Sequence, residues 1–246
     1  MNFTILRFDS LESTNTEAIN QARAGADEGL CILARQQTAG RGRHGRTWNS
    51  PKDSGLYFSI VLRPMIDAKF VPLITLMIGV AVHDSLAELG IKPDIKWVND
   101  VLVGGKKICG ILAETTETPT GLAVIVGIGI NLTSSSFPIE LAGIATSVKE
   151  QTGRLVTPDE MAASLTPFID YFYDMLQDDT RSREICKEWQ RRSSYFSGKP
   201  VRAALGSDMV LGTTDGLEPN GALRIRKDDG SIVIVQAGDI EQLRAT

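Results

Sequence analysis

The chain has 246 residues, of which 42% are hydrophobic, enough to bury a sizeable core as one large domain or as one large and one small domain. Its net charge of −4 at pH 7 argues against nucleic-acid binding over the whole surface, and three scattered cysteines with only two histidines argue against a disulfide framework or a zinc site. No apolar run could span a bilayer and no signal-peptide pattern is present, so we expect a reduced, soluble, cytoplasmic protein that binds no membrane.

Short β-rich runs alternate with helical patterns through the first 132 residues. A capping-box sequence at Thr14 to Glu17 predicts a helix over 14–24, and apolar residues at helical spacing predict another over about 73–89. The polar, glycine-rich stretch 36–54 fits neither helix nor strand, which is typical of a functional loop. The expected strands lie at 3–8, 30–34, 56–62, 95–98, 101–103, 107–113 and 122–132.

The second half of the chain begins with helices and ends in strands. Thr157 and Pro158 open a long helix, and residues 181–192 also have a helical pattern. From Gly198 the pattern changes to short β runs between glycine and aspartate turns, which indicates a small barrel. We therefore expect two domains, residues 1–197 and 198–246. The expected strands of the second domain lie at 201–205, 209–213, 223–225 and 232–235.

The segment Gly40–Trp48 carries the first chemical signal. Three arginines alternate there with three glycines. Glycine lets the backbone approach a ligand closely, and arginine binds phosphate or carboxylate through two parallel donors. No Gly-Lys-Ser/Thr follows, so this is not a Walker A loop. By itself the segment is as consistent with a flexible basic loop or an RNA-binding Arg-Gly tract as it is with a loop that binds an anionic ligand.

Three further stretches have a plain and a functional interpretation. The polar residues in Lys96–Asp100 end a strand, either as a turn or at a site. The adjacent Lys106 and Lys107 point to opposite faces of a strand, so one could face a pocket, although two surface lysines are commoner. The run Gly127–Asn131 does not complete a nucleotide fingerprint, and it indicates a buried strand with close backbone contacts.

Together and in this order, the segments closely resemble those of the biotin protein ligases. The matching pieces are Ser13-Thr14-Asn15, Gln37 to Trp48, Lys96 to Asp100, Lys107 with Gly110, and Gly127 to Asn131. The resemblance covers residues 5–190, and the tail resembles the family's small SH3-like barrel more weakly. It implies an α+β fold in which helices flank a mixed sheet, followed by that barrel.

The resemblance also implies a two-step reaction. Biotin carboxylate attacks the α-phosphate of ATP to give biotinyl-5′-AMP and pyrophosphate, with Mg²⁺ on the phosphates and no dedicated protein ligands for the metal. A lysine of a biotin carboxyl carrier domain, part of a biotin-dependent carboxylase, then attacks the mixed anhydride. Because the adenylate is reactive toward water, we expect the loop Gly40–Trp48 to fold over the ligand.

Each matching position takes an expected role from the family. Lys107, Arg41 and Asp100 are the expected catalytic residues, with Lys107 placed where carboxylate and α-phosphate meet and Asp100 beside the incoming amine. The residues expected at biotin are Ser13, Thr14, Asn15, Gln37, Arg41, Gly42, Arg43, Lys107 and Gly110. Those expected at the nucleotide are Arg43, Trp48, Lys96, Asn99 and Asn131.

Two departures and three alternatives accompany the resemblance. The family often has proline where Val98 stands, and the first strand starts too early for a helix-turn-helix domain, so we expect a ligase without DNA binding or repressor activity. A lipoate ligase, an RNA-binding module using the arginines, and a catalytically dead biotin-binding regulator remain alternatives. The sequence leaves open whether the protein is a monomer or a homodimer.

Overall fold

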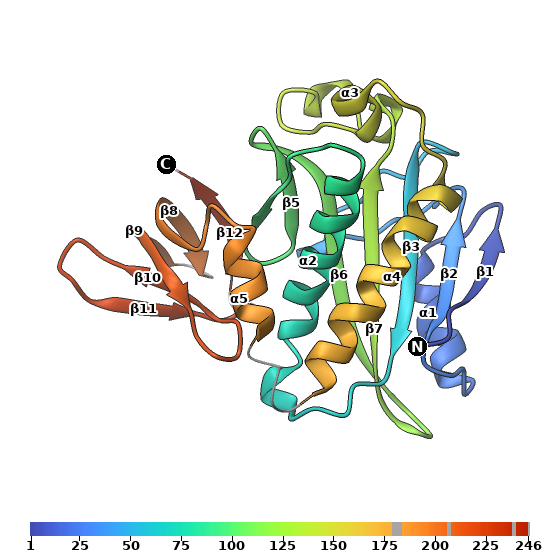
Figure 1. The fold of residues 1–246 in the computed structure, drawn as a ribbon, viewed down its shortest axis with the longest axis horizontal. Coiled ribbons are helices and arrows are strands. Elements are labelled where there is room, and N and C mark those ends of the chain that lie inside the picture. Colours follow the sequence, from blue (N-terminus) through green and yellow to red (C-terminus); the bar gives the residue numbers. More distant parts are fainter. Residues whose placement is uncertain (179–183, 206–207, 238–239, 246) are drawn as a thin grey trace.

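The computed structural model describes residues 1–178, 184–205, 208–237 and 240–245. Its larger part is a seven-stranded mixed sheet in the order β1-β2-β3-β7-β6-β5-β4, in which only the β1–β2 pair is parallel (Figure 1). The strands are β1 (Thr4–Phe8), β2 (Leu30–Ala34), β3 (Gly55–Leu62), β4 (Asp94–Lys96), β5 (Asp100–Val103), β6 (Lys106–Thr118) and β7 (Gly121–Asn131).

Helices cover the two faces of this sheet unequally. The helix α1 (Thr14–Arg23) lies on one face, while α2 (Leu73–Glu88) and α4 (Pro158–Gln177) lie side by side on the other (Figure 1). The helix α5 (Glu184–Arg191) packs against α2; it begins at the first residue described after 178, so the expected residues 181–183 lie outside the described part. A short helix α3 (Val148–Thr152), which the sequence did not predict, precedes α4.

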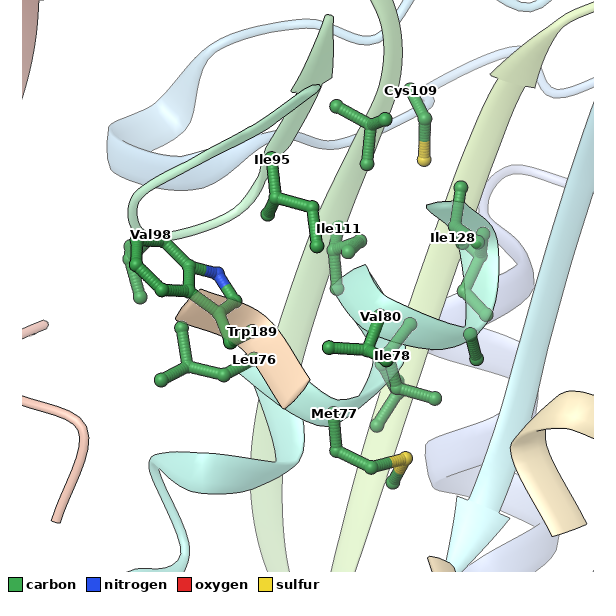
Figure 2. Close-up of a cluster of buried hydrophobic side chains, with 14 of the residues drawn as sticks. Leu76, Met77, Ile78, Val80, Ile95, Val98, Cys109, Ile111, Ile128 and Trp189 are labelled. Atoms are coloured by element: carbon green, nitrogen blue, oxygen red, sulfur yellow. The ribbon is translucent and has the colours of Figure 1, made fainter. Parts of the chain in front are cut away.

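The main core lies between the sheet and α2. This helix is buried almost all round, because α4 and α5 cover the sides that the sheet leaves open. Figure 2 shows Leu76, Met77 and Val80 of α2 against Ile111 of β6, with Trp189 of α5 closing one side. Fully burying an aliphatic side chain contributes about 1.5–3 kcal/mol. The packing of α2 on one face therefore stabilises the sheet, whose opposite face carries α1.

The last part of the chain forms a second, five-stranded antiparallel sheet in the order β11-β10-β9-β8-β12. The expected α+β class, with a small C-terminal β unit, is confirmed. Four of its strands were expected, and the edge strand β12 was not. The bounds are β8 (Ser197–Leu205), β9 (Asp208–Leu217), β10 (Leu223–Arg226), β11 (Ile232–Val235) and β12 (Ile240–Ala245).

The two sheets share one core. The inward side chains of Val201 and Leu223 belong to the same buried cluster as α2. The indole Nε1 of Trp97 donates a 3.0 Å hydrogen bond to the carbonyl of Gly221 in the β9–β10 turn. The division at residue 197 therefore stays a prediction. Among the residues described, no helix is both long and apolar enough to cross a bilayer.

Candidate active site

A cavity of about 550 Å³ opens on the face of the sheet that carries α1. The start of α1, the loop before β3 and the strands β5, β6 and β7 line it, together with residues 136–145 and Leu243. The structure brings every residue predicted for the site to this one cavity. They are Ser13, Thr14, Asn15, Gln37, Arg41, Gly42, Arg43, Trp48, Lys96, Asn99, Asp100, Lys107, Gly110 and Asn131.

The first turn of α1 supplies a buried polar cluster. The predicted capping box is wrong: Ser13 is the N-cap and makes no side-chain cap, and Glu17 accepts a bond from Gln21 instead. The Thr14 hydroxyl and backbone N–H both donate to Oε1 of Gln37, at 3.1 and 2.8 Å. The polar side chains at the start of α1 therefore line the cavity instead of capping the helix.

A second set of contacts orients the amides of this cluster. Ser59 of β3 donates to Oδ1 of Asn15 at 2.6 Å, and its Oγ lies 2.7 Å from the Thr14 hydroxyl. Gln37 donates through Nε2 to Ser50 at 2.8 Å. Because buried polar groups are costly unless paired, this network fixes which donors and acceptors face the cavity. It forms an uncharged pocket suited to a ring with polar edges.

Glycines form the floor of the cavity. Gly110 of β6 and Gly129 of β7 are register partners, and the indole of Trp48 lies on them. A Cβ at Gly129 would come within 2.4 Å of that indole, and one at Gly127 within 2.2 Å of Oδ1 of Asn15. The repeated glycines of β7 therefore make room for side chains of the site, in agreement with the close contacts expected from the sequence.

Trp48 also presents a polar group. Its indole Nε1 is buried without a hydrogen-bond partner among the residues described. The Lys107 ammonium lies 5.4 Å from the centre of its ring, within range of a cation–π contact. Buried indole donors usually have a partner, so this one is available to a ligand that enters the cavity.

A charged group occupies the end of the cavity near β5. Nζ of Lys107 lies 2.6 Å from one oxygen of Asp100, and Nζ of Lys96 lies 3.5 Å from the other. Burial opposes ionisation of Asp100, but the two ammonium groups outweigh it and hold the pKa of that carboxyl below its ordinary value. At neutral pH this end holds two cations and one anion, a net positive charge.

The two asparagines predicted near a nucleotide are tied to the backbone in this structure. The Asn99 amide donates to the Ile111 carbonyl at 2.8 Å, and the Asn131 amide donates to the Thr146 carbonyl at 3.0 Å. Both side chains line the cavity while holding neighbouring segments in place. The peptide bond before Val98, where the family often has proline, is cis.

The C-terminal sheet contributes to the cavity, which the sequence did not predict. The guanidinium of Arg43 donates to the carbonyl of Ala237, beyond β11, and Leu243 of β12 lines the wall. Burial lowers the pKa of Arg43, as does Arg46, while Asp100 raises it. No local pattern in the sequence relates residue 43 to residue 237.

Two polar residues of the site were missed within the larger sheet. Ser59 lies in an otherwise apolar strand, and Glu114 lies beyond the expected end of the strand at residue 113. Strand alternation does give a signal for Glu114, because it lies four residues after Gly110 and so on the same face. The carboxylate of Glu114 binds both Arg41 and Asn15.

Known proteins give the same picture as the geometry. The model of the biotin/lipoate A/B protein ligase family matches residues 7–131, and that of the biotin protein ligase C-terminal domain matches residues 196–242. The chain is 35% identical to the biotin–[acetyl-CoA-carboxylase] ligase of Paracoccus denitrificans, covering 92% of this chain and 95% of that protein. It is 43% identical to the bifunctional ligase/repressor of Bacillus spizizenii, covering 95% of this chain and 72% of that protein.

A solved structure agrees over the whole length. The biotin protein ligase from Aquifex aeolicus in complex with biotin and ATP superposes with a TM-score of 0.86 at 28% identity, covering 99% of each chain. The chain belongs to the biotin/lipoate A/B protein ligase family, and within it to the biotin protein ligases. The predicted activity, a biotin–[acetyl-CoA-carboxylase] ligase, is confirmed at this level. The expected lack of repressor activity stays a prediction.

Proposed function

We propose that the chain uses this cavity to convert biotin and ATP to biotinyl-5′-AMP and then biotinylates a lysine of a biotin carboxyl carrier domain. The observation that carries the proposal is the division of one cavity into two ends. An uncharged end holds Thr14, Asn15 and Gln37, and a net cationic end holds Lys107 and Lys96 around Asp100. Biotin has the matching polarity, with a neutral ureido ring and a carboxylate.

In the first step a biotin carboxylate oxygen forms a bond to the α-phosphorus of ATP, and the bond to pyrophosphate breaks. Two anions must approach each other, so catalysis depends on positioning and on positive charge at the forming bond. Lys107, already placed beside Asp100 and over Trp48, supplies that charge. Arg41 and Arg43 supply further guanidinium donors from the loop, and Trp48 supplies a flat surface for the adenine.

In the second step the carrier lysine attacks the acyl carbon, and AMP leaves. The attacking amine must be deprotonated, yet only a few in ten thousand such groups are neutral at pH 7 at an ordinary pKa of about 10.4. Asp100 is ionised at neutral pH because its pKa lies below the ordinary range, which makes it a weak base. We therefore assign Asp100 to attracting and orienting the incoming ammonium rather than to retaining its proton.

Magnesium enters this scheme with the nucleotide. The described residues contain no group of three or more acidic, histidine or cysteine side chains that could hold a metal ion. Asp100, the carboxylate at the cationic end, is already bound to two lysines. The chain's donor set therefore fits an ion that would be held mainly by phosphate oxygens and water, and that would supply charge neutralisation for the leaving pyrophosphate.

The arrangement of the arginines favours this function over RNA binding. Arg41 donates to Glu114 through its two terminal guanidinium nitrogens, and Arg43 donates to the Ala237 carbonyl, so both are engaged within the molecule. RNA binding through these arginines would also leave the buried polar cluster of Thr14, Asn15 and Gln37 without a role. The cytoplasm, which we expect for this chain, supplies both ATP and the carrier domain.

The deciding experiment separates the alternatives. In one assay the purified protein is incubated with ATP, magnesium and labelled pyrophosphate, with either biotin or lipoate, and incorporation of label into ATP is measured. In a second assay a carrier domain is incubated with the protein, ATP, magnesium and biotin or lipoate, and is then analysed by mass spectrometry. We expect biotin-dependent exchange and one added biotinyl group, both lost in Lys107→Ala. Exchange with lipoate but not biotin would identify a lipoate ligase. No exchange with either would leave a binding protein and overturn the proposal.

A further inference from the structure

Glu114 connects two parts of the cavity that the mechanism treats separately. Its Oε1 accepts from Nη1 of Arg41 and its Oε2 from Nη2, both at 2.8 Å, which is a two-point carboxylate–guanidinium pair. The same Oε2 accepts from Nδ2 of Asn15 at 2.7 Å. One carboxylate on β6 thus holds a residue of the uncharged end and the first arginine of the loop.

The contact with Glu114 decides which atom Asn15 offers to a ligand. The amide donates from Nδ2 to Glu114 and to the Leu112 carbonyl at 3.2 Å, and its Oδ1 accepts from Ser59. With both of its N–H groups engaged, only the remaining lone pair of Oδ1 is free for a ring N–H. A neutral side chain at 114 would remove the strongest reason for this orientation, because a carboxylate accepts and never donates.

The pairing also sets the position of Arg41. Glu114 is the side-chain partner that the structure gives this arginine, whose other link is a backbone bridge to Thr47 within the loop. The side chain of Arg41 is 41% exposed and that of Glu114 26%, so the pair is screened only in part. Without the carboxylate, Arg41 would lose the contact by which it attaches the loop to β6.

We propose that Glu114 is a positioning residue that makes the ring pocket and the arginine loop one unit. It fixes the Asn15 acceptor toward the ureido ring and holds Arg41 at a set distance from it. The two ends of the site are therefore correctly positioned relative to each other before biotin binds. Glu114 contacts neither reacting atom, so its removal weakens biotin binding more than it slows chemistry at saturating biotin. This inference rests on the proposed function.

The test compares Glu114→Gln with Glu117→Gln. Glu117 lies on the same strand, is exposed and has no side-chain partner among the residues that the structure describes, so it controls for the loss of one charge on β6. For Glu114→Gln we expect the KM for biotin to rise about tenfold, as for a lost charge-assisted contact, with kcat at saturating biotin and the KM for ATP within about twofold. For Glu117→Gln neither should change.

A double-mutant cycle tests whether Glu114 acts through the loop. If it does, adding Glu114→Gln to Arg41→Ala raises the biotin KM far less than it does in the wild-type background. Full additivity, or an unchanged biotin KM in Glu114→Gln, would overturn the inference. So would a fall in kcat that only follows the folded fraction measured by circular dichroism.

A second variant keeps the test decisive if Glu114→Gln does not fold. Glu114→Asp retains the charge but withdraws the carboxylate by one methylene, so it cannot reach both partners, and a biotin KM between those of wild type and Arg41→Ala is expected. An unchanged KM would contradict the inference. Failure of the proposed function is recognised separately, because the wild-type protein would then show no biotin-dependent exchange at all.

Discussion

Gly129 shows how a single backbone position keeps the cavity open. Gly129→Ala would bring a Cβ to within 2.4 Å of the Trp48 indole, which then has to leave the glycine floor. We expect the KM for ATP to rise about tenfold or more, since stacking of a base on an aromatic ring is worth about 1–3 kcal/mol. Steady-state kinetics at saturating biotin measure this. Gly143→Ala is the control, because a Cβ there meets nothing within 4 Å; equal effects of the two would exclude Trp48 as the cause.

Asp100 gives a pH dependence whose sign follows from its environment. Because Lys107 and Lys96 depress its folded-state pKa, its contribution to stability is present above the unfolded value of about 4 and is lost as pH falls through the lower folded value. Asp100→Asn should therefore be less stable than wild type at pH 7, and the difference should shrink below about pH 4. Urea denaturation of both proteins from pH 3 to pH 7 measures it; a difference independent of pH would contradict the assignment.

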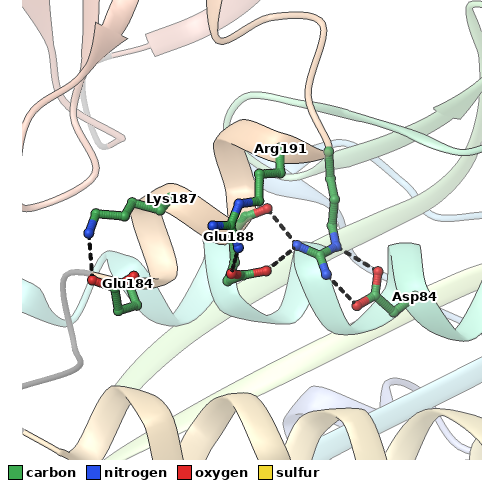
Figure 3. A network of polar contacts seen from close by, with 6 residues as sticks. Asp84, Glu184, Lys187, Glu188 and Arg191 are labelled. Atoms are coloured by element: carbon green, nitrogen blue, oxygen red, sulfur yellow. Dashed lines mark hydrogen bonds and ion pairs between the residues drawn. The ribbon is translucent and has the colours of Figure 1, made fainter.

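At the scale of elements, an ion-pair network joins α5 to α2. Arg192, just after α5, binds both oxygens of Asp84 at 2.6 and 2.8 Å and one oxygen of Glu188 at 2.6 Å (Figure 3). All three side chains are less than a fifth exposed. Arg192→Ala would remove the shared partner of two partly buried carboxylates and leave Asp84 only with His83 and Glu188 only with Arg191. We therefore expect a loss of about 2–3 kcal/mol in the free energy of unfolding.

The same helix provides the control for that prediction. Lys187 pairs with Glu184 at 2.7 Å on the exposed side of α5, where an ion pair contributes little. Lys187→Ala should leave the midpoint of urea unfolding nearly unchanged. If both variants unfolded at the same urea concentration, the network would not be what holds α5 on α2.

Helices and strands were predictable where the spacing of apolar residues agreed with local start and stop signals. The strand 30–34 and the start of α4 at Pro158 match the sequence patterns, because alternation and a capping box are local signals. The strand β6 runs on to Thr118, five residues past its expected end, because polar residues there still pair with β7. The strand β12 was missed since it pairs only with β8, a long-range contact.

The site was predictable as a set of residues but not as a set of contacts. The family motifs brought the expected positions to one cavity, yet the partners of Arg41 and Arg43, namely Glu114 and the Ala237 carbonyl, lie 73 and 194 residues away in sequence. Such pairs follow from strand order and from the packing of the two sheets, which no local pattern records. The Thr14–Glu17 pattern suggested a capping box for the same reason, because the local sequence does not show that the Thr14 hydroxyl bonds to the distant Gln37.

At the scale of the whole molecule, the shared core predicts that the two sheets unfold together. Gly221 marks the junction: its carbonyl accepts from Trp97, and a Cβ there would lie 2.8 Å from Leu76 and 3.0 Å from Leu73 of α2. Its φ of +84° also strains any other residue. Gly221→Ala should therefore cost about 2 kcal/mol or more and lower the stability of both sheets, because each buries part of the other's core.

Gly230→Ala isolates the packing contribution from the backbone strain. Gly230 has a nearly identical φ of +83°, but a Cβ there meets nothing within 4 Å. Hydrogen exchange followed by mass spectrometry should show that Gly221→Ala reduces protection in β6 and β7 as well as in β8 and β9, whereas Gly230→Ala affects the β10–β11 hairpin alone. Loss of protection confined to residues 198–245 in Gly221→Ala would mean that the C-terminal sheet folds as an independent unit. The hydrogen bond from Arg43 to the Ala237 carbonyl would then connect two units that are each stable alone, rather than two parts of one cooperative unit.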